Sequence, residues 1–128
     1  MKVLALDYGA ARTGVAVSDA TGTIARPVGV VTRAAEDRGL AELAGLVGEH
    51  EVGRVVVGMP LTLRGEHGAQ ALETQAFVER LRAAIDVPVE TYDERFSTAL
   101  AVRGGGSADE DARAAAHLLE SYLESLDR

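Results

Sequence analysis

The alternation of apolar and polar residues predicts that the chain begins with three strands. Residues 2–7 form a short apolar run that ends at an acid, and residues 14–18 form a second run after a turn-prone segment. Residues 27–32 form a third run, and Thr21 and Gly22 supply the turn before it. Because no helical pattern separates these runs, we expect an antiparallel meander at the start of the sheet.

Farther along the chain, helical spacing of apolar residues alternates with short buried runs. Helical spacing covers residues 34–50, 69–84 and about 108–126, whereas residues 54–58 and 87–92 have the pattern of strands. The apolar positions expected to face the core from the second helix are Ala69, Leu72, Ala76, Phe77 and Leu81. The order strand, strand, strand, helix, strand, helix, strand, helix predicts an α/β fold with a mixed five-stranded sheet whose later strands are parallel.

Length and composition are typical of one compact domain. The 128 residues are 47% hydrophobic, which suffices for a single core, so we expect one domain over residues 1–128. The sequence contains no cysteine, which excludes disulfides and thiolate metal sites and indicates a reducing compartment, the cytoplasm. The first apolar run is too short for a signal peptide or a membrane span, so we expect no membrane partner.

The charge of the chain constrains its partners. A formal net charge of −7 argues against binding of nucleic acid by the whole surface, because Lys and Arg contacts with phosphates supply most nonspecific affinity. However, all but one of the 13 basic residues are Arg, which binds phosphate in bidentate geometry, and bound divalent cations neutralise carboxylates. The charge therefore disfavours a nucleic-acid-binding protein without excluding it.

Asp7 is the first candidate site residue. It shares a strand face with Val3 and Ala5, and it lies at the carboxyl end of the strand, the edge where α/β sheets bind ligands. A carboxylate at this place is costly unless it is paired or bound to metal. The alternative is an Asx turn with Gly9, and the residue by itself does not decide between metal ligand and turn former.

A second acidic segment follows the fifth predicted strand. Since adjacent residues of a strand point to opposite faces, only one of Asp93 and Glu94 is expected to face the same crevice as Asp7. The alternative is that these acids cap the following helix or hold Arg95 in a surface ion pair. Taken in isolation, the segment favours this structural explanation.

The start of the last helix carries a third group of acids. Ser107 and Glu110 fit a capping box, which accounts for Glu110 and its neighbour Asp109. The positions reached by helical spacing from Asp111, and expected to face the core, are Ala115, Leu118 and Tyr122. Those reached from Glu110, on a more polar side, are Arg113, Ala114 and His117. Asp111 is therefore expected to point inward at the start of the helix.

Together these acids predict a metal site. Inward carboxylates from the first strand, the fifth strand and the last helix form a cluster of hard oxygen ligands suited to Mg²⁺ or Mn²⁺. A pair of such ions activates water for attack on a phosphodiester and stabilises the leaving oxygen. The combination is much more specific than any single acid, and it predicts a metal-dependent nuclease.

Four ordered motifs resemble those of the YqgF family of Holliday junction resolvases, which are also regarded as nucleases that mature the precursor of small-subunit ribosomal RNA. The motifs span nearly the whole chain. They are DYGAARTGVAVSD at residues 7–19, VGMPL at residues 57–61 with Gly65, DERFST at residues 93–98 and DARAA at residues 111–115. The resemblance implies a ribonuclease H-like fold and a nuclease that acts on RNA, on structured DNA such as Holliday junctions, or on both.

The resemblance also implies roles for individual residues. The acids expected to be catalytic and to bind the metal are Asp7, Glu94 and Asp111, with Asp93 as the fallback for Glu94. The residues expected to contact the substrate are Arg12, Arg95 and Thr98. Arg12 lies between two glycines, where a phosphate backbone can come close, although a solvated hairpin Arg is the alternative. Arg95 either positions the scissile strand or orients Glu94.

The chain departs from the family pattern between Thr98 and Asp111. The glycine-rich segment 103–107 stands where a longer basic segment is expected, and Asp109 and Glu110 replace expected basic residues. This departure weakens the expected substrate contact and the expected specificity for four-way junctions.

Two other functions fit parts of the sequence. An ATP-binding phosphotransferase would share the phosphate motif at residues 7–9, but such enzymes need two domains to close around a nucleotide. A non-catalytic nucleic-acid or ribosome-associated module of the same fold would fit the short glycine-rich segment. A homodimer is expected for junction resolution, since two cuts need two active sites, whereas a processing nuclease can act as a monomer.

Overall fold

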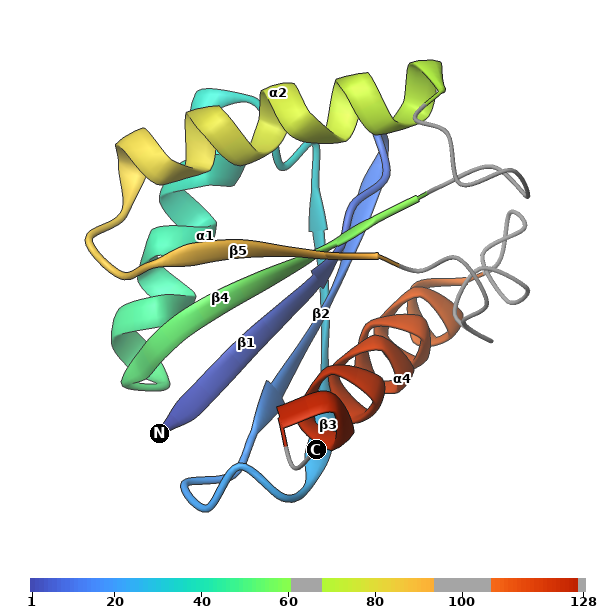
Figure 1. The fold of residues 1–128 in the computed structure, drawn as a ribbon. Helices are drawn as coiled ribbons and strands as arrows, with labels where there is room; N and C mark the ends of the chain where they lie inside the picture. The colour runs from blue at the N-terminus through green and yellow to red at the C-terminus, as the bar shows by residue number, and fades with distance from the viewer. Residues whose placement is uncertain (61–67, 94–106, 127–128) are drawn as a thin grey trace.

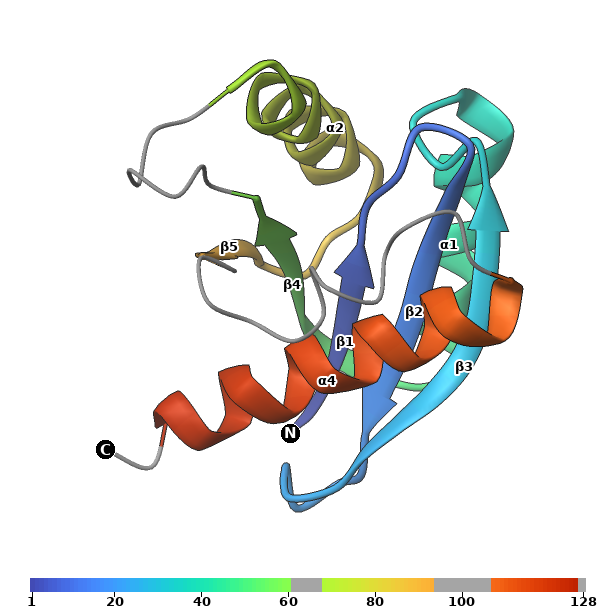
Figure 2. The same ribbon diagram turned by 90° about the vertical axis from the view of Figure 1, so that its right-hand side faces the viewer.

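The computed structural model describes residues 1–60, 68–93 and 107–126, which form a sheet with helices on both faces (Figures 1 and 2). The elements in chain order are β1 (Lys2–Asp7), β2 (Arg12–Ser18), β3 (Ala25–Thr32), α1 (Asp37–Glu49), β4 (Val52–Met59), α2 (Ala69–Ala84), β5 (Val89–Asp93) and α4 (Ala108–Leu126). Each predicted strand and helix named above is present, with ends that differ by a few residues. No helix in the described part of the chain is long and apolar enough to span a bilayer.

Within the described residues, the five strands form one mixed sheet in the order β3-β2-β1-β4-β5. β1 pairs antiparallel with β2, and β2 pairs antiparallel with β3, so the predicted meander is confirmed. β4 runs parallel to β1, and β5 runs parallel to β4, as the intervening helices predict. The carboxyl ends of β1, β4 and β5 therefore share one edge, where Asp7, Met59 and Asp93 end their strands.

The helices divide the core into two layers, one on each face of the sheet. α1 and α2 cover one face, and α4 crosses the other (Figure 2). Leu4 and Leu6 belong to the apolar cluster on the α1 and α2 face, whereas Val3 and Ala5 belong to the cluster under α4. Because both faces are covered, β1 is buried from Val3 to Asp7.

The predicted core positions of α2 are confirmed at Phe77 and Leu81, whereas the first part of the helix buries a different face from the one predicted. Leu72 is 67% exposed, and Ala69 and Ala76 also face solvent. The buried residues are Ala71, Thr74, Phe77, Val78 and Leu81. Thr74 can lie in the core because its hydroxyl donates to the carbonyl oxygen of Gln70 at 2.9 Å. In a helix rich in alanine, apolar composition by itself does not define the buried face.

α4 has the orientation that its spacing predicts. The expected core positions Ala115, Leu118 and Tyr122 are buried. The backbone amide of Glu110 donates to Ser107 Oγ at 3.3 Å, which is one half of the predicted capping box. Ala114, predicted for the polar side, is instead fully buried, because α4 lies against β3 as well as β2.

The carboxylate of Asp19 closes the connection between β2 and β3. Its Oδ1 accepts hydrogen bonds from the backbone amides of Thr23 at 2.8 Å and Ile24 at 3.0 Å. Its Oδ2 accepts a hydrogen bond from the Thr21 hydroxyl at 2.6 Å. These bonds, chiefly the one from Thr21, lower the pKa of Asp19 to about 2. The charged carboxylate thus stabilises the turn that brings β3 to the edge of the sheet.

We expect the stabilisation from Asp19 to be lost in acid. Because folding lowers its pKa to about 2, the contribution is complete above a pH of about 4 and disappears as the pH falls through 2. Urea unfolding of the wild type and of Asp19→Asn at a series of pH values measures this contribution. The difference in unfolding free energy should be largest near neutral pH and vanish at the acid end, and a difference independent of pH would contradict the expectation.

Candidate active site

Asp7 lies at the carboxyl end of β1 and points to the face that α4 covers. Alternation along the strand sets this direction, since Val3 and Ala5 pack under α4 whereas Leu6 packs on the opposite face. Asp7 is only 4% exposed. A charged carboxylate at this depth requires a partner or a cation. The environment of Asp7 is therefore compatible with its predicted role as a metal ligand.

Tyr8 anchors the chain directly after Asp7. Its ring stacks on Phe77 of α2, with the ring centroids 4.5 Å apart and an interplanar angle of 16°. Its hydroxyl donates to Glu73 Oε1 at 3.5 Å. Burial, followed by the nearby Glu73 carboxylate, raises the pKa of Tyr8, so the phenol remains protonated at neutral pH. This anchor on the α2 face holds the end of β1 in place.

Gly14 allows the start of α4 to lie directly on the sheet. Gly14 pairs with Asp7 across β1 and β2. A Cβ atom at Gly14 would overlap the carbonyl group of Asp111 and would lie 3.3 Å from the backbone nitrogen of Ala112. Only a hydrogen atom fits between β2 and α4 at this point. The close approach therefore places Asp111 beside Asp7 at the carboxyl edge of β1.

Arg12 and Asp111 form an ion pair at the same place. Arg12 lies on the same face of β2 as Gly14, and its Nε is 2.9 Å from Asp111 Oδ2. The side chains are 36% and 14% exposed, respectively, so the pair lies at the rim of the core. Asp111 Oδ2 accepts no well-aligned hydrogen bond from any described residue, so the contact is mainly electrostatic. Sequence reasoning missed this pair because no local pattern connects two residues so far apart in the chain.

Asp93 does not join Asp7 and Asp111. Tyr92 packs under α4, and its hydroxyl lies 2.8 Å from Ser121 Oγ. Strand alternation therefore directs the exposed Asp93 to the opposite face of the sheet. This orientation argues against Asp93 as the fallback for the middle metal ligand.

Glu94, Arg95 and Thr98 lie outside the described residues, so their roles as metal ligand and substrate contacts stay predictions. No group of three or more acids or histidines is arranged to hold a metal ion in the part of the chain that the structure describes. Of the predicted ligands, that part holds Asp7, which pairs with Gly14, and Asp111, whose backbone packs on Gly14. Each has one fully buried carboxylate oxygen, and such hard donors fit Mg²⁺ or Mn²⁺.

A polar network fixes the other end of α4. The Tyr122 hydroxyl donates to Glu90 Oε1 at 2.6 Å and accepts a hydrogen bond from Arg54 Nη1 at 3.0 Å. Arg54 Nε pairs with the same Glu90 oxygen at 3.2 Å. Burial first, and then the Glu90 contact, raises the pKa of Tyr122, so its hydroxyl remains a donor. α4 is thus tied to β4 and β5 near its C-terminal end and to β2 at its start.

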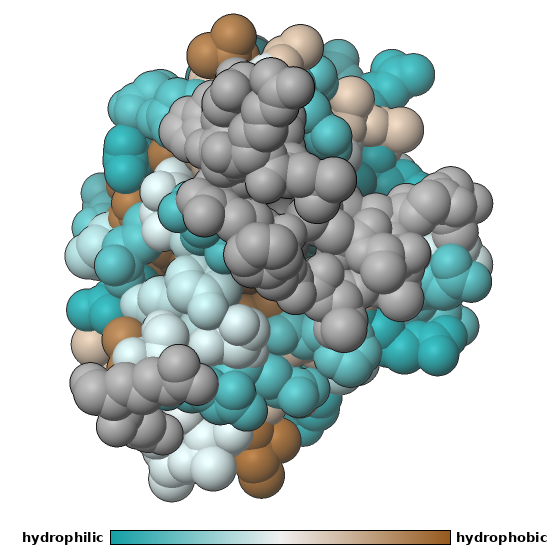
Figure 3. All heavy atoms as spheres, turned by 45° about the vertical axis from the view of Figure 1, so that its right-hand side comes forward, coloured by the Kyte–Doolittle hydropathy of each residue, from teal (hydrophilic) through white to brown (hydrophobic). Residues whose placement is uncertain are grey.

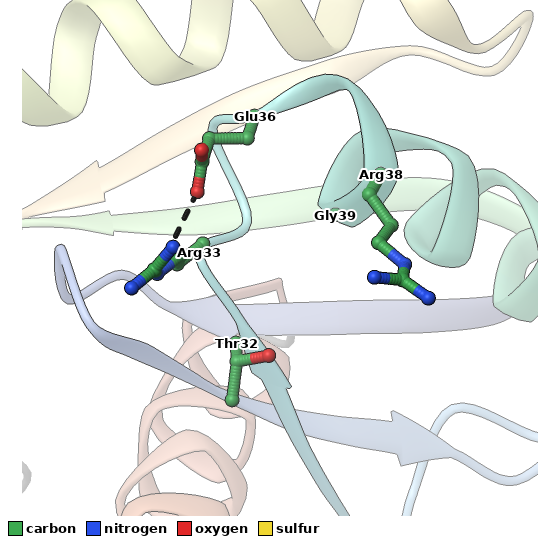
Figure 4. Close-up of a pocket in the computed structure, with 5 residues that line it drawn as sticks. All are labelled: Thr32, Arg33, Glu36, Arg38 and Gly39. Carbon is green, nitrogen blue, oxygen red and sulfur yellow. Dashed lines mark ion pairs between the residues drawn. The ribbon is translucent and has the colours of Figure 1, made fainter.

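A basic hollow lies next to Arg12 on the edge strand β3. Thr32 pairs with Arg12 across β2 and β3, and the amide of Arg33 donates to the carbonyl oxygen of Ala11 at 3.0 Å. The hollow has a volume of about 350 Å³ and is lined by Thr32, Arg33, Glu36, Arg38 and Gly39 (Figure 4). The turn between β3 and α1 is therefore attached to the turn that follows Asp7.

The two arginines of this hollow extend to either side of the turn (Figure 4). Arg33 pairs loosely with Glu36 at 3.8 Å, and its side chain is 77% exposed. Arg38 forms no ion pair with any other residue that the structure describes. Two guanidinium groups are therefore presented to solvent at the turn between β3 and α1, next to the strand that carries Arg12.

The mixed sheet with helices on both faces is a ribonuclease H-like fold. T. thermophilus RuvC, solved in complex with a Holliday junction substrate, matches over 99% of this chain and 96% of that chain, with a TM-score of 0.63 and 18% identity. The Fowlpox virus resolvase, solved with substrate Holliday junction DNA, matches over 100% of both chains, with a TM-score of 0.62 and 13% identity. Identities this low show a common fold, and they do not show a common function.

Sequence comparison shows a closer relationship. The family described as "RuvX: Holliday junction resolvase" matches residues 1–125, and the chain belongs to this family, which confirms the resemblance to YqgF proteins. Its relatives include proteins named "Putative pre-16S rRNA nuclease". One from Chloroflexus aggregans is 41% identical over 96% of this chain and 93% of its own length. Another, from Anaeromyxobacter sp., is 43% identical over 97% of each chain.

We expect Gly14→Ala to displace α4 from the sheet at the candidate site. The added methyl group overlaps backbone atoms that cannot turn aside, so the free energy of unfolding should fall by about 1–3 kcal/mol. Gly45→Ala in α1 is the matched control, because a Cβ atom there meets nothing within 4 Å and alanine favours the helix. Denaturant unfolding measures both changes. Equal stability of the two variants would show that α4 does not depend on Gly14.

Proposed function

We propose that this chain is a metal-dependent nuclease that hydrolyses phosphodiester bonds in nucleic acid, and that residues 1–128 form one catalytic domain. The observation that supports this most strongly is that Gly14, the strand partner of Asp7, carries the backbone of Asp111 directly on it. It gathers two carboxylates with buried oxygens from the first strand and the last helix at one edge of the sheet. The names of the relatives and of the family support the same type of reaction.

We assign Asp7, Asp111 and Glu94 as the ligands of Mg²⁺ or Mn²⁺. The chemistry that such ions supply when bound is activation of water and stabilisation of the leaving oxygen. Asp7 is held by β1 and by the adjacent Tyr8, and Asp111 is held by the contact of its backbone with Gly14. Ligands fixed in this way need little reorganisation to bind a metal.

We propose RNA as the principal substrate, in processing of the small-subunit rRNA precursor, with four-way DNA junctions as a further substrate. The relatives' name supports the first and the family description supports the second. This role places the protein in the cytoplasm with nucleic acid as its partner. Paired cuts in a junction require two active sites, so cleavage of junctions requires a homodimer.

The position of the basic hollow indicates that the nucleic acid extends from the active site toward the turn between β3 and α1. Thr32 on β3 pairs with Arg12 on β2, and neighbouring strands lie about 4.8 Å apart. Arg33 is the residue that follows Thr32. Phosphates of one strand repeat at about 3.4 Å along a duplex axis, so the hollow is within a few nucleotides of the site. On a chain of net charge −7, the exposed guanidinium groups of Arg33, which pairs only loosely with Glu36 at 3.8 Å, and of Arg38 favour phosphate. The coloured part of the surface in Figure 3 is mainly hydrophilic or intermediate with scattered hydrophobic residues, which suits a polar polymer.

A cleavage assay separates the nuclease from a non-catalytic module of the same fold. Purified protein is incubated with Mn²⁺ and single-stranded RNA, single-stranded DNA or a four-way junction. We expect the wild type to cut RNA at least about 100-fold faster than Asp7→Asn or Asp111→Asn, because each variant removes a charged metal ligand. Asp109→Asn changes an exposed acid on the same helix and should retain activity.

Cleavage by the wild type that is no faster than by Asp7→Asn would reject the nuclease. Retained binding of nucleic acid without cleavage would then identify the chain as a non-catalytic module.

We expect the double variant Arg33→Gln/Arg38→Gln to bind single-stranded RNA more weakly and with less dependence on salt. Loss of two phosphate contacts should reduce the slope of log affinity against log salt by roughly 1.4, at about 0.7 per contact. The control is Arg80→Gln/Arg82→Gln, which changes two arginines that are already paired with acids. Fluorescence anisotropy over a range of salt concentrations measures both slopes. A slope unchanged from the wild type would exclude the hollow from the path of the RNA.

A further inference from the structure

The expected roles of Arg12 and Asp111 compete in the structure. Arg12 is the expected phosphate ligand and Asp111 the expected metal ligand, yet Arg12 Nε lies 2.9 Å from Asp111 Oδ2. A guanidinium at this distance shares the carboxylate with any cation that binds there. The ion pair must therefore be compatible with both roles, or it must open before Arg12 and Asp111 can perform them.

The backbone gives Asp111 little freedom to leave Arg12. The carbonyl group of Asp111 packs on Gly14, which follows Arg12 on the same face of β2. The Arg12 guanidinium, in contrast, stands at the end of a long side chain that is 36% exposed. The Asp111 carboxylate is mostly buried at 14% exposure, and its Oδ2 accepts no well-aligned hydrogen bond that would hold the guanidinium in place. If the pair opens, the partner that moves is Arg12.

On the basis of the metal site proposed above, we infer that Arg12 is a positioning residue that occupies the Asp111 carboxylate until a divalent cation binds and then turns to a phosphate of the substrate. Two cations on one carboxylate repel each other, so binding of the metal favours departure of the guanidinium. The planar guanidinium matches two phosphate oxygens, so the substrate offers it an equivalent partner. Arg12 thereby links metal binding to substrate binding.

The opposite arrangement makes a different prediction. Arg12 could stay in place and orient Asp111, while the metal binds the other carboxylate oxygen, as outer-shell partners of metal ligands do. Removal of Arg12 then weakens metal binding. If Arg12 competes with the metal, its removal tightens metal binding, so the sign of the change distinguishes the two arrangements.

Calorimetric titration of the full chain with Mn²⁺ measures this sign. We expect Arg12→Gln to bind Mn²⁺ about tenfold more tightly than the wild type, because one competing positive charge is removed. Arg12→Lys keeps the charge and should remain near the wild type. The control is Arg113→Gln, because Arg113 is exposed at the start of α4 and hydrogen bonds to the carbonyl oxygen of Asp109 at 3.4 Å. An Arg12→Gln affinity equal to or weaker than that of the wild type overturns the inference.

The Mn²⁺ affinity of Asp111→Asn shows whether a negative result concerns the exchange by Arg12 or the metal site itself. If Asp111→Asn binds Mn²⁺ as tightly as the wild type, the proposed metal site is wrong and the inference falls with it. If Asp111→Asn binds weakly and Arg12→Gln does not bind more tightly, the site stands and only the exchange is wrong. Thermal denaturation without metal is the control that tests whether each variant is folded. On addition of Mn²⁺ the Tm of Arg12→Gln should rise more than that of the wild type, because stabilisation grows with affinity.

Discussion

The contact between Gly14 and the first turn of α4 is the constraint on which the candidate site depends. Because Gly14 has no side chain, the backbone of Asp111 lies directly on β2, next to the residue that pairs with Asp7. Any larger residue would lift the helix from the sheet. Two carboxylates do not attract each other, so Asp7 and Asp111 are brought together by backbone packing and not by their own side chains.

The remainder of the α4 face is built to permit this approach. The cluster under α4 includes four alanines, two on the sheet and two on the helix, namely Ala5, Ala16, Ala115 and Ala116, and larger residues such as Leu118, Leu119 and Leu123 follow along α4. Near the other end of α4, the hydrogen bonds of Tyr122 tie it to β4 and β5. A helix held at both ends fixes the position of Asp111, as the proposed metal site would require.

The distribution of charge resolves the conflict between an acidic chain and a nucleic-acid partner. The net charge of −7 describes the whole chain, whereas Arg12 and Arg33 lie near each other where β2 begins and β3 ends, and Arg12 contacts Asp111. Several other arginines are paired with acids elsewhere on the described surface. A protein with a net negative charge can therefore still present arginine side chains to phosphate at one place on its surface.

The sequence by itself determined the order of elements, the mixed sheet and the inward direction of Asp111, because these follow from local periodicity. Its motifs also identified the family. Local pattern left Asp7 undecided between turn former and metal ligand, and only the family resemblance favoured Glu94 over Asp93 as a ligand. Only the tertiary structure decided that Asp93 faces away from Asp7, which face of α2 is buried, and that Arg12 meets Asp111. Those features depend on packing between segments remote in the chain, which local periodicity cannot report.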